Sequence, residues 1–278
     1  GLHKGPFHGF SVEFAEHRLY NTGESTRHID WKLYARTEKL FVKRYEEETN
    51  LRCQMVLDRS SSMYYPQDKK KINKLEFSVL CAASLIQLLR RQRDAVGLSL
   101  FNDRVEQHTR AQSNSMHHRF LMNEMERILH SYDKSSPRKT SAAESLHEIA
   151  DRCPRRSLVV IFSDMFDSTA DNEELFGALQ HLRHNKHEVV LFHVTDRSSE
   201  LELDLGNQPY DFEDMETGEK VRLNPIHVQK AYKKELEAFY ADLKLRCGQY
   251  RIDFVEADIA GGFEPVLMQF LVKRQKMH

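Results

Sequence analysis

The stretch LRCQMVLDRSSSM (residues 51–63) joins a mostly apolar run to one aspartate and three serines. The run 51–57 has the length and composition of a buried β-strand. Asp58, Ser60 and Ser62 then stand at alternate positions of a short loop. Side chains spaced in this way can converge on one point, and their oxygen atoms are the ligands that Mg²⁺ prefers. The stretch therefore predicts a strand that ends in a metal-binding loop, and the competing interpretation is an ordinary polar turn.

Beyond this strand the sequence alternates between helix-like and strand-like segments. Further strands are predicted at 95–101, 104–110, 157–164, 188–196 and 251–257, and helices at 72–93, about 114–131, 141–152, 171–184, 225–248 and from about 263. Apolar strands that alternate with amphipathic helices indicate a parallel sheet with helices on both faces. The short segment 104–110 is expected to form a hairpin with the strand before it. The predicted fold class is α/β, with a doubly wound, mostly parallel sheet.

Two stretches do not follow this alternation. Residues 1–50 are rich in aromatic and charged residues, and the alternation in KLFVKRY predicts extended strands. We interpret them as an N-terminal β arm packed on the core, and residues 51–278 as the main domain. Within that domain, residues 200–223 predict a hairpin excursion, which is either a recognition flap or a solvated loop.

Composition excludes several classes of partner. The 278 residues include 41 basic and 42 acidic side chains, a formal net charge of −1. Such a balance gives no long-range attraction for nucleic acid or an anionic membrane, so neither is expected as a partner. No signal-peptide pattern opens the chain, and the four cysteines lie far apart without metal-binding spacing. Free thiols in a reducing compartment are therefore expected, which predicts a cytoplasmic protein.

Two further loops carry oxygen ligands near predicted strand or helix ends. Asp164 ends the apolar strand in SDMFDS (163–168), and Thr140 lies in SPRKTSAAESL (136–146), just before a helix. In doubly wound sheets, sites form at the carboxyl ends of the strands, near the point where strand order reverses. The predicted metal site therefore consists of Asp58, Ser60, Ser62, Thr140 and Asp164.

This set of loops resembles the metal-ion-dependent adhesion site of von Willebrand factor A domains. The N-terminal stretch GFSVEFAEHRLYNTGESTRHIDWKLYARTEKLFVKRYEEE (9–48) is similar to the signature of domain-of-unknown-function family 58. These are bacterial proteins with a von Willebrand factor A-like core, often encoded beside MoxR-type AAA+ ATPases. The chain departs from the family pattern at Glu24-Ser25, where two aspartates are common, and at Arg138-Lys139, where glycines are common.

The resemblance implies a role for each residue of the predicted site. The hydroxyls of Ser60 and Ser62 would touch the metal directly, and Thr140 would do so directly or through water. Asp58 and Asp164 would act mainly through bound waters. The implied cofactor is Mg²⁺, or Mn²⁺ or Ca²⁺ in the same site.

A metal held mainly by neutral hydroxyls stays electron-poor and can accept an Asp or Glu of a protein partner. We therefore expect a non-enzymatic protein–protein interaction module, an adaptor for a MoxR-type AAA+ ATPase. The alternative is a metal-dependent phosphoesterase using Asp58 and Asp164 with Asp196 or Asp258. A purely structural module with a vestigial site is the third interpretation. The sequence has no Walker loop, GxGxxG or Ser-His-Asp signature.

Overall fold

The computed structural model describes residues 12–21, 26, 29–47, 51–68, 70–130, 142–165, 172–201, 210–213 and 220–276. The chain divides into two compact units, Gly1–Leu51 and Arg52–His278. Thr140 and the turn of the predicted hairpin lie outside the described residues.

The first unit is built on a two-stranded antiparallel sheet. Strand β1 (Val12–Leu19) pairs with β2 (Phe41–Glu47), which contains most of the alternating KLFVKRY stretch. Between them lies a short helix that the alternation did not predict, α1 (Trp31–Thr37). The Asp30 side chain caps α1 by accepting hydrogen bonds from the backbone N–H groups of Lys32 and Leu33.

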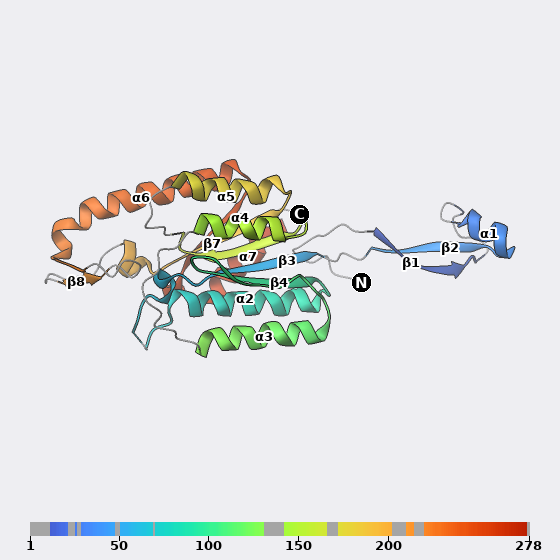
Figure 1. Cartoon of the computed structure of the whole chain (residues 1–278), viewed down its shortest axis with the longest axis horizontal. Helices are drawn as coiled ribbons and strands as arrows, with labels where there is room; N and C mark the ends of the chain where they lie inside the picture. Colours follow the sequence, from blue (N-terminus) through green and yellow to red (C-terminus); the bar gives the residue numbers. More distant parts are fainter. Residues whose placement is uncertain are drawn as a thin grey trace. The chain divides into compact units, whose positions relative to one another are not determined.

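The second unit is built on a six-stranded sheet (Figure 1). Its strands are β3 (Arg52–Asp58), β4 (Ala95–Phe101), β5 (Val105–His108), β6 (Leu158–Ser163), β7 (Glu188–Thr195) and β10 (Asp253–Asp258). They lie in the order β10-β7-β6-β3-β4-β5, and only β5, at one edge, runs antiparallel to its neighbour. Counted along the chain, this is the doubly wound order 3-2-1-4-5-6. The predicted fold class is thereby confirmed.

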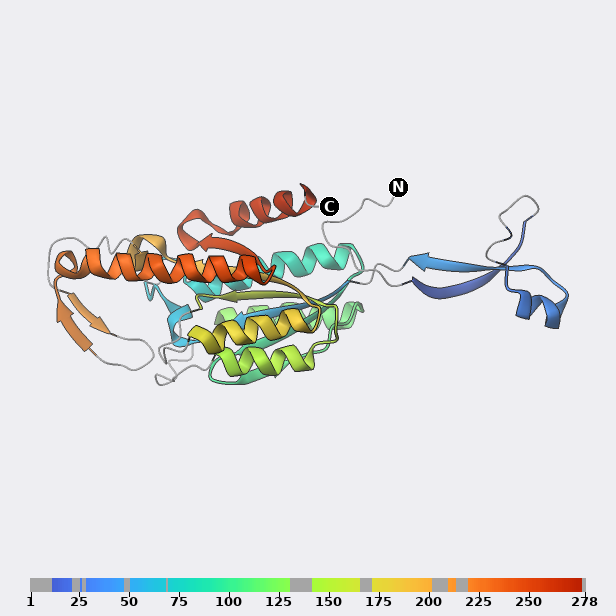
Figure 2. The ribbon, with the colours of Figure 1, turned by 90° about the horizontal axis from the view of Figure 1, so that it is seen from above.

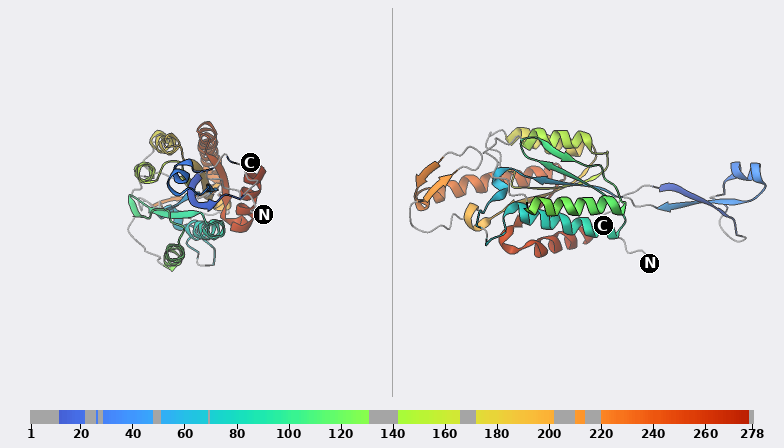
Figure 3. Two further views of the ribbon diagram at one scale, coloured as in Figure 1. Left: turned by 90° about the vertical axis from the view of Figure 1, so that its right-hand side faces the viewer. Right: turned by 60° about the horizontal axis from the view of Figure 1, so that its bottom comes forward.

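Helices cover both faces of this sheet (Figures 1 and 3). They are α2 (Lys74–Arg91), α3 (Ser115–His130), α4 (Ala142–Arg152), α5 (Asn172–His184), α6 (Pro225–Gln249) and α7 (Phe263–Lys276). Helices α4, α5 and α6 share one buried apolar cluster with side chains of the sheet, such as Val56, Ile161 and Leu191. Helices α2, α3 and α7 cover the other face, where the Phe192 and Phe270 rings meet at 5.1 Å.

Strands β8 (Tyr210–Glu213) and β9 (Lys220–Leu223) pair antiparallel with each other, outside the six-stranded sheet. They lie near the start of the long helix α6 (Figure 2). Short turns η2 (Ser61–Tyr64), η3 (Arg197–Leu201) and η4 (Ile259–Gly261) follow β3, β7 and β10. Within the described part of the chain, no helix combines the length and the apolar character that a bilayer crossing requires.

Candidate metal centre

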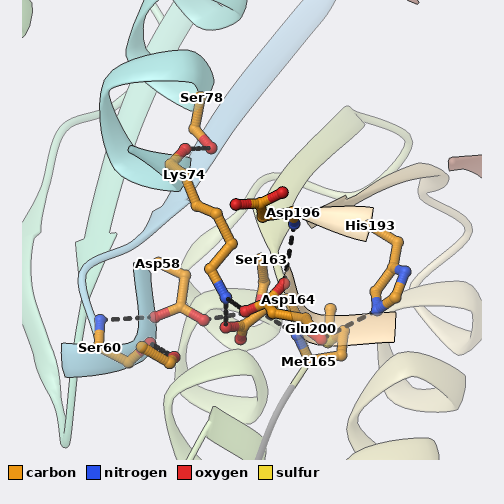
Figure 4. Close-up of polar contacts among 11 residues, drawn as sticks. Asp58, Ser60, Lys74, Ser78, Ser163, Asp164, Met165, His193, Asp196 and Glu200 are labelled. Carbon is orange, nitrogen blue, oxygen red and sulfur yellow. Dashed lines mark hydrogen bonds and ion pairs between the residues drawn. The ribbon is translucent and has the colours of Figure 1, made fainter. Parts of the chain in front are cut away.

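The site lies where the strand order of the main sheet reverses. Strands β3 and β6 are neighbours, and the chain moves away from them in opposite directions, through β4 on one side and β7 on the other. Asp58 is the last residue of β3, and Asp164 directly follows β6. The two carboxylates therefore lie at the carboxyl edge of the sheet, where doubly wound folds place their ligands (Figure 4).

The loop after β3 gathers the oxygen atoms of Asp58, Ser60 and Ser62. Asp58 Oδ1 accepts a hydrogen bond of 2.8 Å from the backbone N–H of Ser60, so the aspartate closes a tight turn. The turn brings the Ser60 and Ser62 hydroxyl oxygens to 3.0 Å of each other. Asp58 and Ser60 are buried. The loop therefore holds one carboxylate and two hydroxyls close together.

Ser163 links this loop to the loop after β6. Its hydroxyl donates a hydrogen bond of 2.5 Å to Asp58 Oδ2 and accepts one of 2.9 Å from the backbone N–H of Met165. The backbone of Met165 has a φ of 52°, in the left-handed region that residues other than glycine rarely adopt. Ser163 thus fixes the side chain of Asp58 and the path of the chain past Asp164.

The Asp58 carboxyl has an unusual protonation equilibrium. Burial, together with the charge of Asp164, raises its pKa from 3.8 to about 7. The hydrogen bonds from Ser163 and Ser60 oppose this shift only in part. Among the residues that the structure describes, no cationic side chain pairs with Asp58. A cation placed beside it would therefore stabilise the ionised form.

Lys74 brings a positive charge to the same edge of the sheet. Its side chain is almost fully buried, and its Nζ lies 2.7 Å from Asp164 Oδ2 and 2.5 Å from Glu200 Oε1 (Figure 4). Burial alone would lower the pKa of Lys74, but the two carboxylates outweigh burial and raise it. The ammonium group is therefore charged, and it already serves as the counter-ion of Asp164.

Glu200 ties this ion pair to the segment after β7. Its second oxygen, Oε2, accepts a hydrogen bond of 2.8 Å from the backbone N–H of Asp196, at the start of η3. Burial raises the pKa of Glu200, and the charge of Lys74 opposes that shift.

His193 lies behind Asp164 on β7. Its Nε2 is 3.0 Å from the backbone carbonyl oxygen of Asp164, and its ring packs against Tyr240 and Phe254. Burial lowers the pKa of His193 to about 4, so the ring is neutral at pH 7. A neutral ring can donate from Nε2 to that carbonyl, which supports the loop beside the carboxylates.

The donor set suits a hard divalent cation in part. Asp58, Ser60 and Ser62 offer only oxygen ligands, and the buried Asp58 carboxylate is the group that a cation would compensate. Asp164 is near enough for its charge to act on Asp58, but Lys74 holds one of its oxygens. In the described part of the chain, no group of three or more His, Cys, Asp or Glu side chains could hold a metal by itself. Any metal here would thus depend on the serine hydroxyls.

The five predicted ligands have different outcomes. The structure brings together Asp58, Ser60 and Ser62, with Asp164 beside them. Thr140 lies outside the described residues, so its predicted role stays a prediction.

The two carboxylates of the phosphoesterase alternative accept hydrogen bonds from other groups. Asp196 Oδ1 accepts from the Ser198 hydroxyl at 2.9 Å. Asp258 Oδ1 caps η4 by accepting from the backbone N–H of Ala260 at 3.2 Å.

Sequence reasoning missed Ser163, Lys74 and Glu200. Ser163 carried a signal, since it stands at the strand end directly before Asp164. Lys74 also carried one, because it lies on the same helical face as the buried Ser78, Cys81 and Leu85. A lysine at a core-facing position of the first helical turn needs a buried anion, and strand-end carboxylates are the nearest candidates. Glu200 had no comparable signal, because its role depends on a single turn of η3.

Comparison with known proteins gives one family match. The family described as "Protein of unknown function DUF58" matches residues 16–242. No curated protein matched the chain.

Several solved structures are similar. The conserved hypothetical protein BatB from Bacteroides thetaiotaomicron shares 13% identity, with 81% of this chain and 99% of that chain covered and a TM-score of 0.43. An aerotolerance-related membrane protein from Bacteroides fragilis shares 14% identity, with 82% and 100% covered and a TM-score of 0.46. A mutant of the PilB minor pilin from Streptococcus sanguinis shares 9% identity, with 86% and 65% covered and a TM-score of 0.41.

Proposed function

The chain belongs to the DUF58 family of proteins of unknown function, and within that family we propose that it is a non-enzymatic, metal-dependent protein-binding module. The binding site is the loop of Asp58, Ser60 and Ser62, with Asp164 beside it. The observation that carries the proposal is the buried Asp58 carboxylate, which has two serine hydroxyls on the same loop and no cationic partner among the described residues.

Each residue of the site would have its own role toward the cation. Ser60 and Ser62 would hold a divalent cation, Mg²⁺ or alternatively Mn²⁺ or Ca²⁺, through their hydroxyl oxygens, with Thr140 as a further predicted ligand. Asp58 would orient the bound waters, and its own orientation is fixed by Ser163 and by the Ser60 N–H. Such a cation supplies an electron-poor centre to which a carboxylate can bind. The partner would therefore be a protein that offers an Asp or Glu.

The arrangement favours binding over hydrolysis. A hydrolytic site of this kind uses a positioned base or a second metal to activate water. Of the carboxylates available for that role, Asp196 accepts from the Ser198 hydroxyl, and Asp258 accepts from the backbone N–H groups of Ala260 and Arg197. The Lys74 ammonium further reduces the negative charge at Asp164, which a second metal would require.

The proposal also includes a partner protein and a cellular compartment. We propose a MoxR-type AAA+ ATPase as a partner and the cytoplasm as the compartment. The four cysteines support a reducing compartment, since all four are buried thiols that form no disulfide.

Partner capture with and without Mg²⁺ tests the proposed function. The immobilised protein should retain a partner in Mg²⁺ and release it in chelator. Ser60→Ala and Ser62→Ala should each weaken capture at least tenfold, because each removes one of two neutral ligands. Ser61→Ala is the matched control: it is a serine of the same loop outside the alternating pattern, and it should bind like the wild type.

Thermal unfolding of the isolated protein supplies the second measurement. Mg²⁺ should raise the melting temperature of the wild type and of Ser61→Ala by mass action, and much less that of Ser60→Ala. Equal capture by all variants in chelator would contradict the proposal and would place recognition elsewhere on the chain.

A further inference from the structure

Lys74 occupies an unusual position for a lysine. It is the first residue of α2, where the helix dipole disfavours a positive charge, and its side chain is only 2% exposed. Burying an ammonium group is costly unless oppositely charged groups surround it. Two carboxylates from other elements do so here: Asp164 after β6 and Glu200 in η3. Three segments thus converge on one nitrogen atom, at the edge of the sheet that carries the candidate metal ligands.

The charges at this edge leave room for one more cation. Asp58, Asp164 and Glu200 contribute three negative charges when ionised, and Lys74 contributes one positive charge, so the group carries −2. Asp58 is the member without a cationic partner among the described residues, whereas Asp164 has one. The same carboxylate, Asp164, is therefore the predicted ligand of a metal and the present partner of Lys74.

We propose that Lys74 is an internal competitor of the divalent cation: its ammonium group holds Oδ2 of Asp164 and competes for this carboxylate with a cation, or with the waters of a cation, beside Asp58. This inference rests on the proposed function and adds a residue that sets the affinity of the site for the divalent cation. Lys74 compensates the negative charges of Asp164 and Glu200, and it lowers the affinity of the site for Mg²⁺. Glu200 retains the ammonium group when Asp164 is withdrawn, because it contacts the same Nζ independently.

Two variants separate this competition from a simple change of charge. Lys74→Met removes the competitor but leaves Asp164 and Glu200 buried without it, and the group then carries −3. The double variant Lys74→Met/Glu200→Gln also removes the ammonium group from Asp164 but carries −2, the same as the wild type. A glutamine at 200 can still accept the Asp196 N–H, so the turn of η3 is preserved. The double variant therefore remains informative if Lys74→Met alone does not fold.

The experiment is calorimetric titration of metal-free protein with MgCl₂. The double variant is expected to bind Mg²⁺ about tenfold more tightly than the wild type, and Lys74→Met at least as tightly as the double variant. The matched control is Lys244→Met/Glu256→Gln, which makes the same substitutions in a solvent-exposed pair 2.6 Å apart. Its dissociation constant should stay within twofold of the wild type.

The outcomes are distinct. A gain of threefold or more in the double variant, absent from the control, supports the competition. A smaller gain, or an equal gain in the control, overturns it and leaves the proposed metal site intact. Binding by the double variant but not by the wild type also supports it. If neither the wild type nor any variant binds Mg²⁺, the proposed function fails, and the inference fails with it.

Discussion

Asp58 is a buried carboxylate whose charge should respond to pH in the metal-free protein. Its pKa is about 7 in the folded protein, against the ordinary value of 3.8 for the unfolded chain, so the folded state binds the proton more tightly. The stability that this proton contributes is complete below about pH 4 and is lost as pH rises towards 7. The loss follows a slope of at most about 1.4 kcal/mol per pH unit.

Asp58→Asn tests this dependence, because asparagine does not titrate. In chelator, the variant should gain stability relative to the wild type as pH rises from about 4 to 7. Urea unfolding at a series of pH values measures the difference. Mg²⁺ should reduce the gain, since a bound cation compensates the ionised Asp58. A stability difference that is constant over this pH range would refute the buried, uncompensated carboxylate.

Ser60 and Ser62 could be predicted from sequence, whereas Lys74 and Glu200 could not be placed in the same site. The serines follow a strand at fixed spacing, and a tight turn determines where they point. The contacts of Lys74 with Asp164 and Glu200 span 90 and 126 residues of sequence. The core-facing position of Lys74 indicates a need for a buried anion, but no local pattern specifies which carboxylates supply it, because the pairing depends on how three separate elements meet.

Gly97 in strand β4 has no room for a side chain. A Cβ atom added at Gly97 would lie 2.3 Å from Gln54 Oε1 and 2.6 Å from the backbone carbonyl oxygen of Thr109. Since Thr109 O is a backbone atom, it cannot move aside without shifting the chain. Gly97→Ala should therefore lower the free energy of unfolding by about 1–3 kcal/mol.

Gly177 in α5 provides the matched control. An added Cβ there meets no atom within 4 Å, and alanine favours a helix. Gly177→Ala should raise the free energy of unfolding by about 0.5–1 kcal/mol. Chemical denaturation of both variants measures the contrast. Equal stability of Gly97→Ala and the wild type would contradict the packing at this strand.

Comparison of the predicted with the observed helices and strands shows which local sequence patterns were sufficient for prediction. The strands of the main sheet were predicted to within one or two residues, because they are short apolar runs between amphipathic helices. Helix α1 was not predicted: its seven residues are too few for a clear helical period, and the Asp30 cap helps to hold its first turn. Its register depends on that cap and on the flanking strands β1 and β2.

The whole chain combines the main domain with an N-terminal unit, and the sequence predicts that this unit packs on the domain. This unit carries Phe7, Phe10, Phe14, Tyr20, Trp31, Tyr34 and Phe41. So much apolar area is costly to leave in water, at about 25 cal/mol per Å². Deleting residues 1–48 should therefore lower the melting temperature or cause aggregation. Differential scanning calorimetry of the two chains tests this, and an equally stable, monodisperse truncation would show that the unit is independent.

The central claim is that the loop of Asp58, Ser60 and Ser62 holds a divalent cation. A crystal structure of the protein with Mn²⁺, which accepts the same oxygen ligands, tests it most directly. We predict an anomalous-scattering peak bonded to the hydroxyl oxygens of both Ser60 and Ser62, and no such peak in a Ser60→Ala crystal. An ion bound elsewhere on the chain, or ordered serine hydroxyls without an ion at saturating Mn²⁺, would contradict the account.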